Sequence, residues 1–322
     1  MLFRSKREDI HDLDILPFPA YHLIDDISVY APPPNKYRTL PVVNVITSRG
    51  CPNNCTFCDK SIFRETYRER SAQNILAELQ YLKKAYNFNE IAFVDDTFLV
   101  NKNRLRELFD LLDRENIHFS WTCMSRINNV DEDFLKFLKS KGCWHISFGI
   151  ESGNQQILNT IRKNIDLDRV KQVVDWCHKL GIKSQGVFII GHPGETLDTI
   201  NQTIELALNL RLDDITVTIN TPIPGSEQYN TADSYGTLDK TDWSDFSYWR
   251  PVFVPKGLTE QLMLAKQKEF YIKFYRQPKH ILRYLGSFFG KGGIKRLMSV
   301  GKIIGYAFAR TQSQKNNMFV IV

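Results

Sequence analysis

The chain has 322 residues, of which 43% are hydrophobic and 24% are charged, with six cysteines and a net charge of +6. This composition is typical of a globular protein, and it excludes a disordered chain, a collagen-like fibre and a disulfide scaffold. The N-terminus lacks the apolar stretch of a secretory signal, and no apolar run is long enough to cross a bilayer, so we expect a cytoplasmic protein. Residues 256–322 carry a net charge of +11 and residues 1–255 carry −5, which indicates a mildly acidic body and a basic tail.

The first 41 residues contain prolines at positions where helices and central strands would fail, so we expect an extended arm or linker. From residue 42 onward, short β-branched runs alternate with segments of helical spacing. The expected strands are 42–47, 90–94, 118–124, 144–149, 183–190 and 214–219, and the expected helices are 72–86, 104–115, 131–141, 155–161, 167–180 and 197–210. This alternation predicts an α/β fold of parallel strands with right-handed crossovers, either a doubly wound open sheet or a partial barrel.

Beyond residue 225 the pattern loosens. Residues 229–255 are rich in aromatic side chains and are predicted to be irregular, whereas 259–275 is predicted to be a helix with Thr259 as its N-cap. Two short basic amphipathic helices are expected at 279–289 and 293–308. We therefore divide the chain into an arm (1–41), a core (42–225) and an aromatic and basic helical extension (226–322).

Three cysteines, Cys51, Cys55 and Cys58, stand in a C-x3-C-x2-C pattern in the loop after the first expected strand. Three thiols this close suit a thiophilic metal centre. A structural zinc site would need a fourth ligand, and the nearest histidines, His22 and His118, are not at ligand spacing. Three cysteines on a [4Fe–4S] cluster leave one iron free to bind a substrate or cofactor, which predicts a catalytic centre. The remaining cysteines are expected to pack in the core: Cys123, Cys143 and Cys177.

The run CPNNCTFC at 51–58, with Phe57 directly before the last cysteine, resembles the radical S-adenosylmethionine (SAM) enzymes. The resemblance covers residues 42–224 and implies a partial (β/α)6 TIM-like barrel. It also implies that Cys51, Cys55 and Cys58 hold a catalytic [4Fe–4S] cluster and that Phe57 lies beside the cofactor. SAM would be cleaved reductively to a 5′-deoxyadenosyl radical, with an electron supplied by a donor such as flavodoxin or ferredoxin.

The resemblance also implies which residues contact SAM at the ends of the expected strands. Asp95 and Asp96 would meet the amino group, although an N-cap for the next helix is an alternative. Lys163 would pair with the carboxylate, with a solvated lysine as the alternative, and Arg126 is a second candidate for an anionic group.

Two glycine-containing segments complete the implied site. In G-I-E-S-G (149–153), Glu151 would bond the ribose hydroxyls, with Ser152 beside it. In G-H-P-G-E-T (191–196), Gly191 would line the adenine side, and His192 is either a proton donor or a turn residue.

The segment DLDILPFP (12–19) and the motifs FVDD, GIESG and GHPGET resemble the cobalamin-dependent class of radical SAM enzymes. That class includes the magnesium-protoporphyrin cyclase type, hopanoid-modifying enzymes and C- or P-methyltransferases. Its members normally carry an N-terminal cobalamin domain with a D-x-H-x-x-G motif, and this sequence contains no such motif. We therefore expect cobalamin only as an additional cofactor, whose domain is absent from this chain.

Residues 281–310 alternate apolar and basic side chains, which predicts a helical cap on the barrel, with peripheral membrane contact as the alternative. The predicted function is hydrogen abstraction or methyl transfer on a small or lipid- or tetrapyrrole-like substrate. The alternatives are a non-catalytic iron–sulfur accessory or electron-transfer protein and an RNA-modifying radical SAM enzyme. No separate RNA-binding domain supports a nucleic-acid partner.

Overall fold

The computed structural model describes residues 8–282 except 25, 31, 33–35 and 64–65. Its centre is a parallel sheet of six strands in the order β1-β4-β5-β6-β7-β8, so the predicted α/β partial barrel is confirmed. The strands are β1 (Val42–Val45), β4 (Glu90–Phe93), β5 (Ser120–Ser125), β6 (Cys143–Glu151), β7 (Lys183–Ile190) and β8 (Asp214–Ile219).

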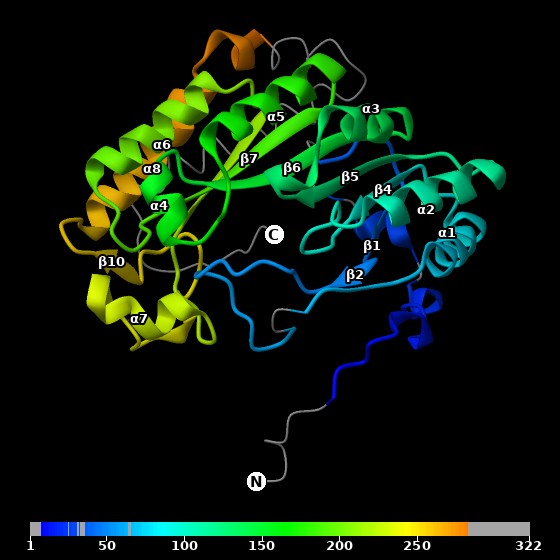
Figure 1. Ribbon diagram of the computed structural model, residues 1–322, viewed down its shortest axis with the longest axis horizontal. Helices are drawn as coiled ribbons and strands as arrows, with labels where there is room; N and C mark the ends of the chain where they lie inside the picture. Colours follow the sequence, from blue (N-terminus) through cyan, green and yellow to red (C-terminus); the bar gives the residue numbers. More distant parts are fainter. Residues whose placement is uncertain (1–7, 25, 31, 33–35, 64–65, 283–322) are drawn as a thin grey trace.

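Helices cover the outer face of this curved sheet (Figure 1). They are α1 (Ala72–Tyr86), α2 (Lys102–Arg114), α3 (Glu132–Ser140), α4 (Gln155–Thr160), α5 (Leu167–Leu180), α6 (Leu197–Asn209) and α8 (Glu260–Tyr275). The core between the two layers is closely packed, and large side chains such as Trp121, Phe148 and Phe188 are fully buried. The three cysteines expected in the core are buried there as well: Cys123, Cys143 and Cys177.

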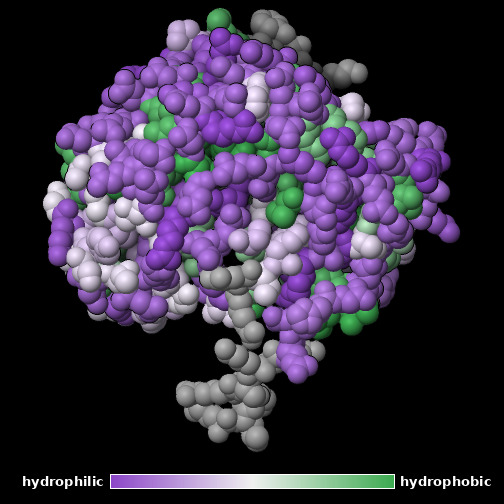
Figure 2. Space-filling model, in the orientation of Figure 1, coloured by the Kyte–Doolittle hydropathy of each residue, from purple (hydrophilic) through white to green (hydrophobic). Residues whose placement is uncertain are grey.

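The inner face of the sheet has a different character. Residues of β5 and β8 alternate between buried and partly exposed positions, and Met124 on the inner face is 48% exposed. Polar side chains of neighbouring strands bond to one another there: Ser147 donates to Gln185 (2.7 Å), and Gln185 donates to Thr216 (2.9 Å). The surface view in Figure 2 is mostly hydrophilic, with hydrophobic side chains in small separate groups.

Helix ends follow from local sequence. Ser71 accepts a hydrogen bond from the amide of Asn74 and begins α1, as predicted. Gly181, with φ of 66°, ends α5. The expected ranges of α1, α5, β7 and β8 agree with the structure at both ends, and the other predicted core elements agree to within a few residues.

The arm is not extended throughout. Its described residues contain three 3-10 turns, η1 (Leu13–Ile15), η2 (Tyr21–Leu23) and η3 (Ile27–Tyr30). The first turn forms because the Asp12 carboxylate accepts the amide of Asp14 at 2.9 Å. Tyr21 is buried against the core, so the arm is docked on the fold.

The prediction that residues 229–255 are irregular is wrong at both ends of the range, whereas 239–252 contain only one short 3-10 turn, η5 (Trp243–Asp245). Helix α7 (Glu227–Tyr235) leads into β9 (Gly236–Leu238), which pairs antiparallel with β10 (Phe253–Pro255) around a small core of its own. Helix α8 follows with Thr259 as its N-cap, as predicted. Residues 283–322 lie outside the described part, and so do most of the expected basic helices. None of the helices described is both long enough and apolar enough to cross a membrane.

Candidate active site

The cysteine loop leaves the sheet after β1 and is closed by a short ribbon, in which β2 (Ser48–Arg49) pairs with β3 (Arg68–Glu69). Gly50 permits the sharp turn into the loop, because its φ is +81° and a Cβ there would lie 2.1 Å from the carbonyl oxygen of Thr66. Along the loop, Cys51 is half-buried, Cys55 is buried and Cys58 is exposed.

Positive charge surrounds Cys55. Arg126, at the end of β5, donates to its Sγ at 3.2 Å and also bonds the carbonyl oxygen of Lys163. A hydrogen bond from Cys58 and the charges of Lys163 and Arg126 hold the pKa of Cys55 well below its usual range, against the opposing effect of burial. The site therefore favours a thiolate at Cys55.

A buried ion pair lies next to this thiol. Glu151 ends β6 with φ of 69°, where the register with β7 shifts, and its Oε1 accepts Lys163 Nζ at 2.6 Å. Each side chain is only 6% exposed, and Glu151 Oε2 has no hydrogen-bond partner within the described residues. Lys163 Nζ also lies 5.8 Å from the centre of the Phe57 ring. The structure thus places Arg126 and Lys163 beside Cys55, with Glu151 and Phe57 next to Lys163.

Ser152 lies beside this pair, but its hydroxyl is already engaged. It shares a hydrogen bond with Thr203 of α6 (3.2 Å) and accepts the amide of Asn154 (3.2 Å). Its contacts in the structure are to the β6–α4 loop and α6.

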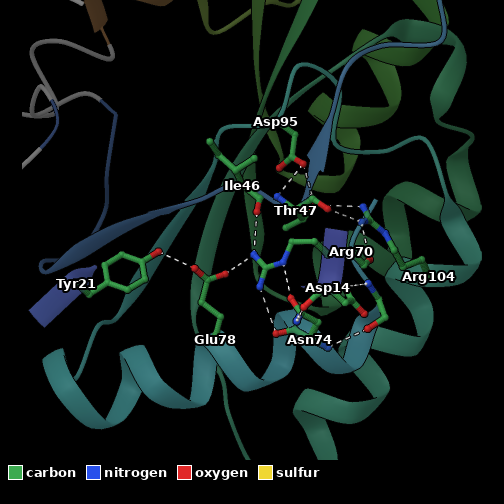
Figure 3. Close-up of polar contacts among 10 residues, drawn as sticks. Asp14, Tyr21, Ile46, Thr47, Arg70, Asn74, Glu78, Asp95 and Arg104 are labelled. Atoms are coloured by element: carbon green, nitrogen blue, oxygen red, sulfur yellow. Dashed lines mark hydrogen bonds and ion pairs between the residues drawn. The ribbon is translucent and has the colours of Figure 1, made fainter. Parts of the chain in front are cut away.

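Asp95 is buried at the end of β4. Its Oδ1 accepts the Thr47 amide (3.0 Å) and hydroxyl (2.9 Å) and the Ser48 hydroxyl, and the dashed lines to Thr47 are visible in Figure 3. Its Oδ2 has no partner among the residues described, and burial raises the pKa of the carboxyl. Asp96 is exposed. Neither carboxylate caps α2, because Asn101 accepts the amide of Arg104 there.

The loop after β7 is held by Glu195, which the sequence reasoning missed. Its carboxylate accepts the amides of Gly191 and His192, and burial raises the pKa of Glu195 to about 8. His192 is fully buried 5.7 Å from the Phe57 ring, and neither ring nitrogen has a partner in the described chain. Burial and the charge of Lys163 lower the pKa of His192 to about 3. The signal in the sequence was Glu195 itself, four residues after a glycine that ends a strand.

A cavity of about 290 Å³ opens beside the cysteine loop. Its lining includes Cys55 and Cys58 of the loop and also Gly225 and residues of α7. Arg162 and Glu227, which both line the cavity, form a two-pronged ion pair at 2.8 Å, and Gln228 of α7 donates to the carbonyl oxygen of Thr56 in the loop (3.0 Å), so α7 forms part of the cavity wall.

The donor set fits an iron–sulfur centre in kind, since three thiols share one loop and two of them line a cavity flanked by cations. Within the described residues, no group of three or more His, Cys, Asp or Glu side chains is gathered closely enough to hold a metal ion.

The model of the radical SAM superfamily matches residues 45–207, half of the chain. This chain belongs to the radical SAM superfamily. It is 35% identical over 277 residues to an uncharacterized methyltransferase of Pyrococcus horikoshii, covering 85% of this chain and 59% of that protein. It is 28% identical to the cytidylyl-2-hydroxyethylphosphonate methyltransferase of Streptomyces wedmorensis (71% and 45% covered) and 22% identical to the anaerobic magnesium-protoporphyrin IX monomethyl ester cyclase of Rubrivivax gelatinosus (96% and 57%). The chain thus spans about half the length of these relatives.

Solved structures show the same fold. The radical SAM methyltransferase TsrM of Kitasatospora setae, solved with tryptophan and a SAM analogue, superposes with a TM-score of 0.58 at 15% identity, covering 74% of this chain and 52% of that one. Coproporphyrinogen III oxidase of Escherichia coli superposes with a TM-score of 0.50 at 16% identity, covering 73% of this chain and 51% of that one.

Membership makes this chain a radical SAM enzyme, with a [4Fe–4S] cluster and SAM as its family cofactors. The Streptomyces and Rubrivivax relatives are named for small-molecule substrates. The relatives carry enzyme names, which does not favour the accessory-protein alternative, and none of the three is named for RNA, so the RNA-modifying alternative is not favoured either.

Proposed function

We propose that this chain is the SAM-cleaving core of a radical SAM enzyme that supports methyl transfer to a small or tetrapyrrole-like molecule. The observation that carries the proposal is the buried ion pair of Glu151 and Lys163, which lies beside the loop of three cysteines, one of them in contact with Arg126. Methyl transfer is preferred over simple hydrogen abstraction because the relatives from Pyrococcus and Streptomyces are named methyltransferases. Cobalamin is a candidate additional cofactor, because TsrM was solved with cobalamin and a [4Fe–4S] cluster bound.

We assign Cys51, Cys55 and Cys58 as the ligands of the cluster. When bound, the cluster supplies the electron that breaks a carbon–sulfur bond of SAM. Arg126 and Lys163 offset the negative charge that gathers at this end of the barrel. Residues of the loop and of α7 both line the cavity, and this supports a role of α7 in limiting the access of water to the thiols.

The side chains near the loop would each bind one part of SAM. Lys163 carries the positive charge for the carboxylate, and Glu151 holds that ammonium in place while keeping one oxygen for a ribose hydroxyl. Asp95 has one unpartnered oxygen for the ammonium group of SAM. The Gly191 backbone lies next to His192, which contacts Phe57.

Three further assignments are adjusted by these contacts. Ser152 is proposed to hold its loop, because its hydroxyl is bonded to Thr203. Arg126 is proposed to act on Cys55 and not on SAM, because its guanidinium donates a hydrogen bond to the Cys55 sulfur. Asp96, which is exposed, is proposed to reach SAM only from the open edge of the site.

The electron donor proposed is a flavodoxin or ferredoxin, which would approach the side where Cys58 is exposed. A cytoplasmic location stays a prediction. Peripheral membrane contact through the basic tail also stays a prediction, because residues 283–322 lie outside the part described.

Anaerobic reconstitution with iron and sulfide tests the proposal. We expect roughly four irons per chain and 5′-deoxyadenosine or methylated product that depends on dithionite and SAM. Cys55→Ser should abolish cluster binding, whereas Cys177→Ser, a core cysteine, should keep it. A reconstituted chain that binds the cluster but never consumes SAM would contradict the proposed activity, and methyl-labelled SAM would distinguish methyl transfer from hydrogen abstraction.

A further inference from the structure

The cysteine loop leaves the fold at residues 47–49 and returns at residues 68–70, and these two segments lie side by side. We call this pair of segments the neck of the loop. Ser48 pairs with Glu69 across the β2–β3 ribbon, and the amide of Arg70 donates to the carbonyl oxygen of Thr47 at 3.0 Å. The cysteine loop, described at 50–63 and 66–67, is attached to the fold at this neck. A second anchor is Thr56, whose amide donates to the carbonyl oxygen of Ile161 at 3.1 Å and whose carbonyl oxygen accepts the amide of Gln228 in α7 at 3.0 Å. Whatever fixes the neck therefore helps to fix the positions of the three thiols.

Arg104 of α2 binds both strands of the neck. One terminal nitrogen donates to the carbonyl oxygens of Thr47 (2.9 Å) and Arg70 (3.2 Å), and the other donates to the Thr47 hydroxyl (3.2 Å). Figure 3 shows that Thr47 continues the chain of contacts to Asp95. A buried guanidinium thus ties the two strands of the neck to the end of β4.

Arg70 connects the neck to α1. Its guanidinium donates to the carbonyl oxygen of Ile46 (3.0 Å) and to the side chain of Asn74 (2.6 Å), and it pairs with Glu78. Glu78 is only 1% exposed, and its other oxygen accepts the hydroxyl of Tyr21 at 2.7 Å. Because Tyr21 belongs to the arm, the arm reaches the neck through one buried carboxylate (Figure 3).

Three more contacts place the arm on the strand by which the loop returns. Ile10 accepts a hydrogen bond from Arg68 (2.7 Å), and the Asp14 carboxylate accepts the amide of Ser71 (2.9 Å). The ring of Phe18 lies 5.4 Å from the Arg70 guanidinium. Residues 10–21 therefore run along the segment 68–71 with polar contacts at both ends.

We propose that arm residues 10–21 form a latch that keeps the neck of the cysteine loop closed, with Tyr21, Glu78 and Arg70 as positioning residues for the thiols. The link to a metal centre rests on the proposed function, whereas the latch is a property of the chain alone. Opening the latch would release the segment 68–71 and let the loop depart from its folded position.

Alkylation of the full chain, with iron removed by a chelator, tests the latch residue by residue. Mass spectrometry would follow Cys55, which is buried in the loop, and Cys177, which is buried in the core and reports global opening. Tyr21→Phe removes one hydroxyl and should speed alkylation of Cys55 roughly tenfold without changing Cys177. The matched control is Tyr271→Phe, which removes the hydroxyl of a half-buried tyrosine bonded to Val217 of β8 and should leave the alkylation rate of Cys55 unchanged.

Arg70→Lys keeps the positive charge but loses the planar guanidinium group with its several donors. It should therefore speed the alkylation of Cys55 at least as much as Tyr21→Phe does. In the reconstituted enzyme, both variants should lose iron to a chelator faster than wild type. The latch would be overturned if the alkylation rate of Cys55 were unchanged in both variants. It would also be overturned if alkylation of Cys55 and of Cys177 became faster by the same factor. If wild type binds no iron, the proposed function fails, and the alkylation rates still decide the latch.

Discussion

Removal of the buried lysine should destabilise the fold strongly, and a second substitution should restore it. Lys163 Nζ lies 2.6 Å from Glu151 Oε1, both side chains are 6% exposed, and Glu151 Oε2 lacks a partner among the described residues. Lys163→Met would leave a buried carboxylate without a counter-charge, which costs roughly 3–5 kcal/mol. That is a large share of the roughly 5–15 kcal/mol that stabilises a typical domain. Lys163→Met with Glu151→Gln removes both charges of the pair, so its free energy of unfolding should return to within about 2 kcal/mol of wild type.

Urea unfolding of wild type, the single variant and the double variant measures these differences. Equilibrium dialysis of the reconstituted proteins measures SAM binding, which should stay at least about tenfold weaker in the double variant because a charge-assisted hydrogen bond is gone. A single variant that loses less than about 1 kcal/mol would refute the burial of the pair. A double variant that binds SAM as wild type does would refute the assigned role of Lys163.

Two further predictions concern the loop after β7. Burial raises the pKa of Glu195 from 4.5 to about 8 in the folded state, so its stabilising contribution is complete below pH 4.5 and is lost as the pH rises to 8. Glu195→Gln should remove this dependence of the free energy of unfolding on pH, which is at most about 1.4 kcal/mol per pH unit. If the free energies of unfolding of variant and wild type ran parallel between pH 4.5 and pH 8, the prediction would be contradicted. Gly191→Ala combines a positive φ with a Cβ only 2.4 Å from the terminal methyl (Cε) of Met263, which is fully buried and would have to move aside, whereas Gly194→Ala has a positive φ but nothing within 4 Å. Thermal unfolding should therefore show a larger loss for Gly191→Ala than the roughly 1–2 kcal/mol of backbone strain expected for Gly194→Ala, and equal losses would refute the steric argument.

The elements that the sequence predicted to the residue have strong local signals. Helix α5 has an amphipathic period, an Asp166 N-cap and a terminal glycine, and β7 is a run of residues suited to a strand. Helix α7 was missed because its buried side chains, Gln228 and Ala232, give no apolar period. Helix α7 is held in place by contacts between residues that are far apart in the sequence, such as Arg162 with Glu227.

The same distinction applies to the site. The motif predicted that Asp95 follows a strand, but its contacts with Thr47 and Ser48 depend on how a neighbouring strand ends. Lys163 was equally compatible with solvent, and its burial follows from the turn at 162–164, where Arg162 and Asn164 have positive φ. Local patterns carry no information about such pairings across the sheet.

The division of the sheet into two unlike faces has a consequence for how this enzyme can change. Residues such as Phe188 on the outer face fill the core, so substitution there reduces stability. Residues such as Met124, Ser147 and Thr216 on the inner face contribute little to that core. A change of inner-face side chains can therefore alter what the barrel accepts while the fold keeps its stability. One scaffold can in this way acquire new substrates by small steps, each of which leaves a folded protein.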